Sequence, residues 1–248
     1  MMNEETRNPQ STKENRMPAS SATAAPLPAE FLRTYLPQIF TEAFSDRQQA
    51  MIDAFAEVLA FGGWRAIAAE EGEGKTSLCQ GLAVYAAVHA MRRFVVLISA
   101  DTRRAEAARE NIRHMVDAVA YRDGRYPPDL SLLRGPLLVL PPVGAVPPGA
   151  CGPILACRSI TGPLRGLHHQ GHRPDLVIID DPDTHETTRS QAEFERREQI
   201  IDSDLAGLGG PDRGVEMFFL GTVRGGASLA ARYTDPRQKP AWRALDCG

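Results

Sequence analysis

Apolar residues are distributed along the chain in two different patterns. Four short runs are apolar at most positions, which is typical of strands buried in a sheet, and they cover residues 64–69, 93–99, 176–179 and 215–220. Elsewhere apolar residues recur at spacings of three and four, which predicts helices near residues 45–61, 78–88, 101–119 and 190–205. This alternation of strands and helices predicts an α/β fold with a mainly parallel central sheet flanked by helices.

The segments outside this pattern set the expected domain limits. Residues 1–30 are polar and contain four prolines, so we expect a disordered tail that cannot bury enough apolar surface to fold. Residues 31–236 are expected to form one domain, with residues 237–248 as a C-terminal stub. Within the domain, residues 121–152 predict loops around a short apolar run at 137–140, and residues 153–167 predict a hairpin or a short strand.

Composition narrows the class of protein. The formal net charge of −3 shows no overall basic excess, so any contact with nucleic acid has to come from a local patch. The four cysteines form no C-x-x-C pair, which argues against a disulfide framework or a zinc site and favours a reducing compartment. No apolar run reaches the roughly 18–20 residues that cross a bilayer, and the first residues lack a secretion-signal pattern, so we expect no membrane association.

A glycine-rich turn joins the first apolar run to the helix after it, with the sequence AEEGEGKTS over residues 69–77. The phosphate-loop pattern G-x-x-x-x-G-K-[ST] is matched except that Ala69 replaces the first glycine. Glycine lets backbone N–H groups approach phosphates, and a helix N-terminus attracts anions. A surface turn with an ordinary lysine is the alternative for the motif alone, but the flanking strand and helix favour phosphate binding. The predicted ATP-binding set is Gly72, Glu73, Gly74, Lys75, Thr76 and Ser77.

Two residues of this turn have specific predicted roles. Lys75 is expected to reach the β- and γ-phosphates of ATP, and the Thr76 hydroxyl is expected to hold Mg²⁺.

Two aspartates end the third apolar run, in the sequence DLVIIDDPD over residues 175–183. Ligands of open α/β sheets bind beyond the carboxyl ends of the strands, so Asp180 is predicted to hold Mg²⁺ together with Thr76. Asp181 is predicted to activate the attacking water, with Glu186 as the reserve candidate. An acidic turn after a strand is common, and it is the combination with the glycine-rich turn that indicates a catalytic site.

Two further positions each allow two interpretations. Ser45 and Gln48 form a capping box that opens a helix, while a glutamine upstream of a phosphate loop can also bind adenine. We prefer the capping role for Gln48 because it requires no ligand. Thr222, just beyond the run at 215–220, either senses the γ-phosphate or caps the following turn.

Two polar clusters also have alternative interpretations. A histidine-rich loop contains His168, His169, His172 and Arg173. No carboxylate or cysteine stands at ligand spacing, so we prefer a solvated loop to a metal site. One predicted helix carries Arg103, Arg104 and Arg113. These arginines either face DNA or solubilise the helix.

The order of the motifs resembles the ATPase domain of the large terminase subunit, the DNA-packaging motor of tailed bacteriophages. The resemblance covers residues 36–236, and its segments are FSDRQQAMIDAF, EGEGKTSL, RFVVLIS, ITGPLRGL, RPDLVIIDDPDTHE and FLGTV. The run from Arg173 to Pro182 is the most specific of them, since the phosphate loop is shared by many ATPases.

This resemblance implies a three-layer, RecA-like P-loop NTPase that uses ATP and Mg²⁺ to move double-stranded DNA into a procapsid. It implies a homo-oligomeric ring that docks on a portal protein and receives DNA from a small terminase subunit, in the cytoplasm of a bacterial host. By the same resemblance, Lys75 and Thr76 bind phosphate and Mg²⁺, Asp180 is the metal carboxylate, Asp181 is catalytic, and Thr222 couples the γ-phosphate to motion.

Two departures from the family pattern leave other functions open. Glu71 stands where such loops often carry an arginine that stabilises transition-state charge; we expect its carboxylate to point away from the phosphates. The chain also leaves no room for the C-terminal nuclease domain of large terminases. The alternatives are therefore a truncated, weakly active or inactive terminase remnant that binds nucleotide or packaging partners, and another helicase-like P-loop ATPase.

Overall fold

A seven-stranded sheet forms the centre of the computed structural model, which describes residues 25–123, 135–142, 149–184, 186–211, 213–224 and 228–246. The strands in chain order are β1 (Trp64–Ala68), β2 (Phe94–Ser99), β3 (Leu137–Val139), β4 (Ile154–Ser159), β5 (Leu176–Asp180), β6 (Glu216–Gly221) and β7 (Trp242–Asp246). Their order across the sheet is β3-β4-β2-β5-β6-β1-β7. Strand β3 runs antiparallel to β4, and the other neighbouring strands pair in parallel.

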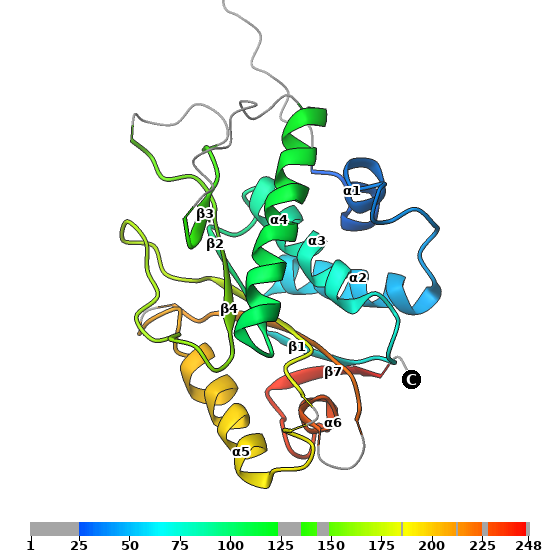
Figure 1. Ribbon diagram of the computed structural model, residues 1–248, viewed down its shortest axis with the longest axis vertical. Helices are drawn as coiled ribbons and strands as arrows, with labels where there is room; N and C mark the ends of the chain where they lie inside the picture. Colours follow the sequence, from blue (N-terminus) through cyan, green and yellow to red (C-terminus); the bar gives the residue numbers. More distant parts are fainter. Residues whose placement is uncertain are drawn as a thin grey trace, which may run out of the picture.

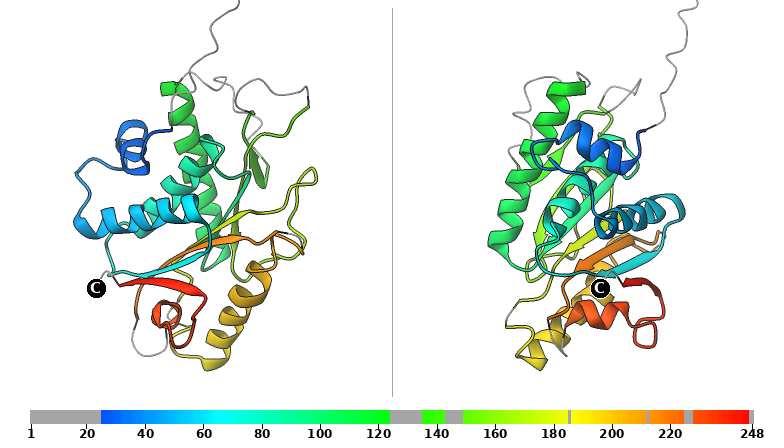
Figure 2. Two further views of the ribbon diagram at one scale, coloured as in Figure 1. Left: turned by 180° about the vertical axis from the view of Figure 1, so that it is seen from behind. Right: turned by 90° about the vertical axis from the view of Figure 1, so that its right-hand side faces the viewer.

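Helices cover both faces of this sheet, which gives the fold three layers (Figure 1). One face carries α1 (Pro28–Tyr35), α2 (Asp46–Phe61), α3 (Lys75–Val88) and α4 (Thr102–Asp123). The other face carries α5 (Gln191–Gln199), the π-helical turn Ile200–Leu205 and α6 (Leu229–Thr234). Figure 2 shows α5 and α6 together on the side of the sheet opposite α2 and α4. The three-layer α/β fold with a mainly parallel central sheet, expected from the sequence, is therefore confirmed.

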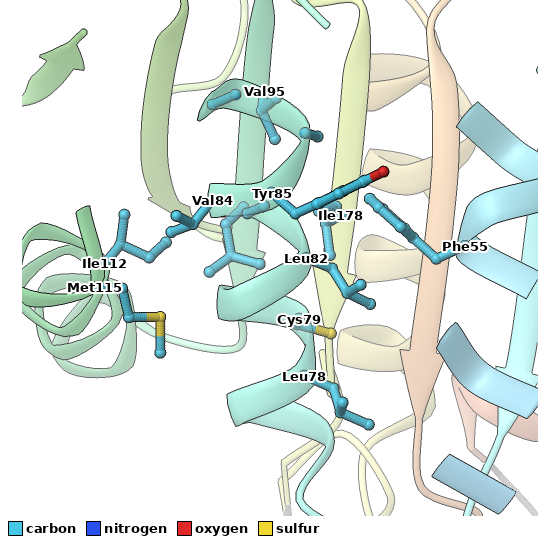
Figure 3. Close-up of a cluster of buried hydrophobic side chains, with 14 of the residues drawn as sticks. Phe55, Leu78, Cys79, Leu82, Val84, Tyr85, Val95, Ile112, Met115 and Ile178 are labelled. Carbon is cyan, nitrogen blue, oxygen red and sulfur yellow. The ribbon is translucent and has the colours of Figure 1, made fainter. Parts of the chain in front are cut away.

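Helix α3 lies at the centre of the larger core (Figure 3). Its residues from Leu78 to Val88 are all buried, so it has no solvent-facing stripe. Leu82 and Tyr85 lie among Phe55 of α2 and Ile178 of β5, while Val84 lies toward Ile112 of α4. Because α3 is held on several sides, its N-terminus and the loop before it occupy a well-defined position.

The second core lies beneath the opposite face and joins the end of the described chain to the sheet. Phe219 of β6 stacks on Tyr233 of α6, with 5.2 Å between ring centroids, and Trp242 of β7 packs against Tyr233 at 5.0 Å. The Tyr233 hydroxyl donates a hydrogen bond to Asp202 over 2.8 Å. These contacts anchor α6 and β7 as parts of the same domain.

The C-terminal boundary predicted at residue 236 is therefore wrong. Residues 242–246 form β7, which pairs in parallel with β1 along its length. The mixed sequence WRALD does not look like a buried strand, because β7 is an edge strand and needs fewer apolar positions.

Two other segment predictions can be compared with the structure. The segment 153–167 contains a single strand, β4, which pairs in parallel with β2. The short-strand interpretation is therefore correct and the hairpin interpretation is wrong. Helix α1 begins at Pro28, within the segment expected to be a tail, while residues 1–24 lie outside the described residues. Among the described residues, no helix is both long enough and apolar enough to cross a membrane.

Candidate active site

Three loops meet at one edge of the sheet because β6 lies between β1 and β5 and all three strands are parallel. The loops also bond to one another directly. The Ala69 amide after β1 donates to the Gly221 carbonyl over 3.0 Å, and the Asp181 amide after β5 donates to the Leu220 carbonyl over 2.8 Å. The carboxyl ends of these strands therefore form one continuous site, as the ligand-binding edges of open α/β sheets do.

The glycine-rich turn after β1 adopts a conformation suited to an anion. Gly72 and Gly74 have φ values of 87° and 71°, in the left-handed region that glycine adopts without strain. A Cβ atom on Gly72 would meet no other atom within 4 Å, so this side of the turn is open. Gly74 is the N-cap residue of α3 and has no side chain to cap the helix. The N–H groups of the first turn, including that of Ser77, are therefore available to phosphate oxygens.

Lys75 is largely buried at the start of α3. Its ammonium donates a hydrogen bond to the Glu70 carbonyl, so the side chain folds back across the turn. A triphosphate in the turn would offer this ammonium stronger, charged acceptors than a carbonyl oxygen.

The two motifs touch through Thr76 and Asp180. The Thr76 hydroxyl donates to Asp180 Oδ1 over 3.1 Å, although the two residues are 104 positions apart in the sequence. Asp180 is only 6% exposed, and this burial raises the pKa of its carboxyl to about 7, with the Thr76 hydrogen bond acting in the opposite direction.

A hydroxyl and a carboxylate in contact fit the way Mg²⁺ is bound beside phosphates. Mg²⁺ usually takes one or two protein oxygens and completes its octahedron with phosphate oxygens and water. No group of three or more His, Cys, Asp or Glu side chains within the described ranges could hold a metal by itself. Thr76 and Asp180 are therefore suited to an ion that arrives with a nucleotide, and their roles as ligands stay a prediction.

Asp181 is held by the segment that follows β6. Its Oδ1 accepts the Thr222 amide over 3.1 Å, and its Oδ2 lies 2.9 Å from Nη2 of Arg224. Asp181 has a φ of 42°, an uncommon conformation for a residue with a side chain, which its contacts sustain. The Thr222 hydroxyl is buried and has no hydrogen-bond partner among the described residues.

Gln48 performs two tasks in the structure. Its amide oxygen accepts the Ser45 N–H over 3.1 Å, which completes the predicted capping box of α2. Its amide nitrogen also donates to the Glu73 carbonyl over 3.2 Å. Arg47 lies 2.9 Å from the carboxylates of both Glu70 and Glu73. Helix α2 therefore helps to fix the shape of the glycine-rich turn, and the adenine-binding alternative for Gln48 stays a prediction.

Two other acidic residues named from the sequence, Glu71 and Glu186, are exposed to solvent. Glu71 has a side chain that is 82% exposed, as expected for a carboxylate directed away from phosphates. Glu186 is exposed and lines a cavity of about 730 Å³ together with Asp101 and Arg189. No described contact joins Glu186 to Asp180 or to the phosphate loop, so the geometry favours Asp181 over Glu186 as the water-activating residue.

Asp183 supports the site but was not recognised from the sequence. This buried carboxylate accepts the Leu229 amide at the start of α6 over 2.8 Å, and the Thr187 hydroxyl lies 3.4 Å from its other oxygen. Burial raises the pKa of Asp183, and the hydrogen bond from Leu229 opposes that rise. The sequence signal was the third aspartate of the DDPD run, but its partner lies 46 residues away.

We expect Asp183→Ala to destabilise the fold by about 1–3 kcal/mol, because it leaves a buried N–H group at the start of α6 without an acceptor. Urea unfolding of the variant measures this change. The control is Asp53→Ala, which removes an exposed carboxylate on α2 that bonds only to Gln49 among the described contacts; it should change stability by less than about 0.5 kcal/mol. Equal effects of the two substitutions would contradict the assigned role of Asp183.

The two polar clusters show little sign of ligand binding. His169 and His172 pair through their backbones, and Arg93 lies 3.4 Å from the His172 ring. Among the described residues, no group of three His, Cys, Asp or Glu side chains is arranged to hold a metal ion, so the preference for a solvated loop stays a prediction. On α4, Arg113 bonds to Glu110 and Asp117, which favours the solubilising interpretation for that residue. Arg104 forms a looser pair of the same kind with Asp101, at 3.6 Å.

The glycine-rich turn after β1 and the aspartates after β5 therefore lie together at the carboxyl edge of a mainly parallel sheet. Among solved structures, the chain is similar to the ATPase domain of the large terminase of Thermus phage P74-26, with 14% identity and a TM-score of 0.47 over 83% of this chain and 86% of that one. An arginine-to-alanine mutant of the same domain gives 12% identity and a TM-score of 0.45 over the same shares of the two chains. No protein-family model and no curated protein matches the chain. The function is therefore argued from the residues of this chain.

Proposed function

We propose that this chain is an ATP-hydrolysing motor domain of the large-terminase kind, which uses ATP and Mg²⁺ to move double-stranded DNA. The observation that carries the proposal is the hydrogen bond of 3.1 Å between Thr76 and Asp180. P-loop NTPases hold their magnesium ion with a hydroxyl from the phosphate loop and an aspartate from a neighbouring strand end. This chain brings those two groups into contact at the carboxyl edge of its sheet.

Binding of ATP would use groups that are already in place. The N–H groups that follow Gly72 and Gly74 would surround the phosphates, and Lys75 would exchange the Glu70 carbonyl for the β- and γ-phosphate oxygens. Thr76 and Asp180 would hold Mg²⁺, which supplies positive charge at the phosphate oxygens.

Hydrolysis would then require a positioned water. Its oxygen forms a bond to the γ-phosphorus while the bond from that phosphorus to the bridging oxygen of ADP breaks, and the water proton passes to the Asp181 carboxylate. Thr222 lies beside Asp181, and its buried hydroxyl has no hydrogen-bond partner among the described residues. This hydroxyl could therefore bond to the γ-phosphate. Loss of the γ-phosphate on hydrolysis would break that bond and so change the contacts at the end of β6.

The motor role comes from the resemblance of the motif order to large terminases. By that resemblance, the chain would assemble as a homo-oligomeric ring on a portal protein, receive DNA from a small terminase subunit and work in the cytoplasm of a bacterial host. The lack of an overall basic excess means that DNA contact would rely on a local surface.

We expect the chain to release phosphate from ATP in the presence of Mg²⁺ and to do so several-fold faster when double-stranded DNA is added. The test is a phosphate-release assay with and without DNA, at low and moderate salt, because phosphate-backbone contacts weaken with ionic strength. If DNA has no effect on the rate of hydrolysis, the motor role is contradicted and the chain is better described as a general P-loop ATPase. Tight nucleotide binding without phosphate release would favour an inactive terminase remnant. Ala69 and Glu71, which depart from the usual loop pattern, are the reason to consider that alternative.

A further inference from the structure

Arg224 lies three residues beyond the end of β6, and its guanidinium reaches between two of the converging loops. Its Nη2 is 2.9 Å from Asp181 Oδ2 and 3.9 Å from Glu71 Oε1. The side chain is 20% exposed, so it lies largely within the site. No local sequence pattern selects Arg224, because its position depends on β6 being the neighbour of both β1 and β5.

The two carboxylates hold this arginine unequally. Glu71 is solvent-exposed, and an ion pair of this kind contributes little. The Asp181 side chain is only 14% exposed, and its pair with Arg224 has the short distance of a charge-assisted hydrogen bond. Asp181 is therefore the group that holds Arg224 in the nucleotide-free chain.

Two donors of this segment are left without acceptors. The Arg224 Nε and the Thr222 hydroxyl are both buried, and neither has a hydrogen-bond partner within the described residues. A guanidinium has a planar fork that matches an oxyanion with two oxygens, yet Asp181 uses one end of it. A phosphate group between the glycine-rich turn and the β5 end would supply the missing acceptors.

We infer that Arg224 is the arginine that binds the γ-phosphate from within the same chain. The inference rests on the proposed function. When ATP binds, γ-phosphate oxygens replace the Asp181 carboxylate as partners of Arg224. The exchange brings positive charge to the transferring phosphoryl group and frees Asp181 to hold the attacking water.

The test compares Arg224→Gln with the wild type in turnover and in nucleotide binding. We expect turnover to fall about 10²–10³-fold, as when one charge-stabilising donor is removed. Affinity for ADP should stay within about twofold, because Arg224 serves the γ-phosphate site. Affinity for ADP with Mg²⁺ and aluminium fluoride, which imitates the transferring phosphoryl group, should fall at least about tenfold. Calorimetry measures both affinities. Arg224→Lys should give turnover and affinity for the fluoride complex between those of the wild type and Arg224→Gln, because lysine keeps the positive charge but lacks the planar guanidinium that binds two oxygens.

The matched control is Arg165→Gln, which breaks another arginine–aspartate pair, with Asp204 at 2.8 Å, and should leave all three quantities unchanged. A thermal unfolding scan shows whether each variant is folded. If Arg224→Gln is unfolded, Arg224→Lys is compared with the wild type instead. Wild-type turnover in the Arg224 variant, or equal losses of affinity for ADP and for the fluoride complex, would overturn the inference and leave the proposed function standing. A wild-type chain that binds no nucleotide would overturn both.

Discussion

Replacing Lys75 with alanine is expected to lower the rate of ATP hydrolysis by about 10²–10³-fold or more. Lys75 is the one ammonium in the described site, and its contact with the Glu70 carbonyl places it at the centre of the glycine-rich turn. Removing it takes away a full positive charge that would face the transferring phosphoryl group. The measurement is phosphate release at saturating ATP and Mg²⁺.

Lys239→Ala is the matched control for this prediction. Lys239 is also an ammonium with a poorly exposed stem, and it lies 2.8 Å from Glu198 in the network beneath the opposite face of the sheet. It should change stability without lowering turnover. Hydrolysis that survives in Lys75→Ala, or that falls equally in Lys239→Ala, would contradict the assignment of the turn as the phosphate site.

The second large effect is expected from Asp180→Asn, and it has two parts. The variant should lose hydrolysis, because a neutral amide is a poor ligand for Mg²⁺. The nucleotide-free variant should also be more stable than the wild type at pH 8, by up to about 4 kcal/mol. Burial raises the pKa of Asp180 from 3.8 to about 7, so the folded state binds this proton more tightly than the unfolded state. The stability that the neutral carboxyl provides is complete below about pH 4 and is lost as the pH rises through 7.

Urea unfolding of both proteins across the pH range tests this linkage. The difference in unfolding free energy should be near zero at about pH 3, where the carboxyl is protonated in the folded state and mostly protonated in the unfolded chain, and should grow as the pH rises to 8. Mg²⁺ with a nucleotide should stabilise the wild type but not the variant. A variant that is less stable at every pH would show that Asp180 is a structural residue.

The sequence predicted the parts of the site that depend on local patterns. The apolar runs placed β1, β2, β5 and β6. The glycine-rich turn placed Thr76 at the start of α3, and the DDPD run placed Asp180 at the end of β5. Their contact was predicted from the rule that parallel strands share a ligand-binding edge.

The residues that were missed depend on strand order, which no local pattern contains. Arg224 acquires its partners only because β6 lies between β5 and β1, and β7 is a strand only because β1 offers it an edge. Arg47 likewise contacts the phosphate loop because α2 packs beside β1, with its first turn pointing at the loop. These positions become visible once the topology is known.

A crystal structure with a non-hydrolysable ATP analogue and Mg²⁺ tests the central claim most directly. The account predicts that the triphosphate lies in the turn that contains Gly72 and Gly74, with Lys75 on its terminal phosphates. It predicts an Mg²⁺ ion about 2.1 Å from the Thr76 hydroxyl, with the Asp180 carboxylate as a ligand directly or through water. A nucleotide bound elsewhere, or an ion that leaves both residues without contact, would contradict a single pocket built from these two motifs.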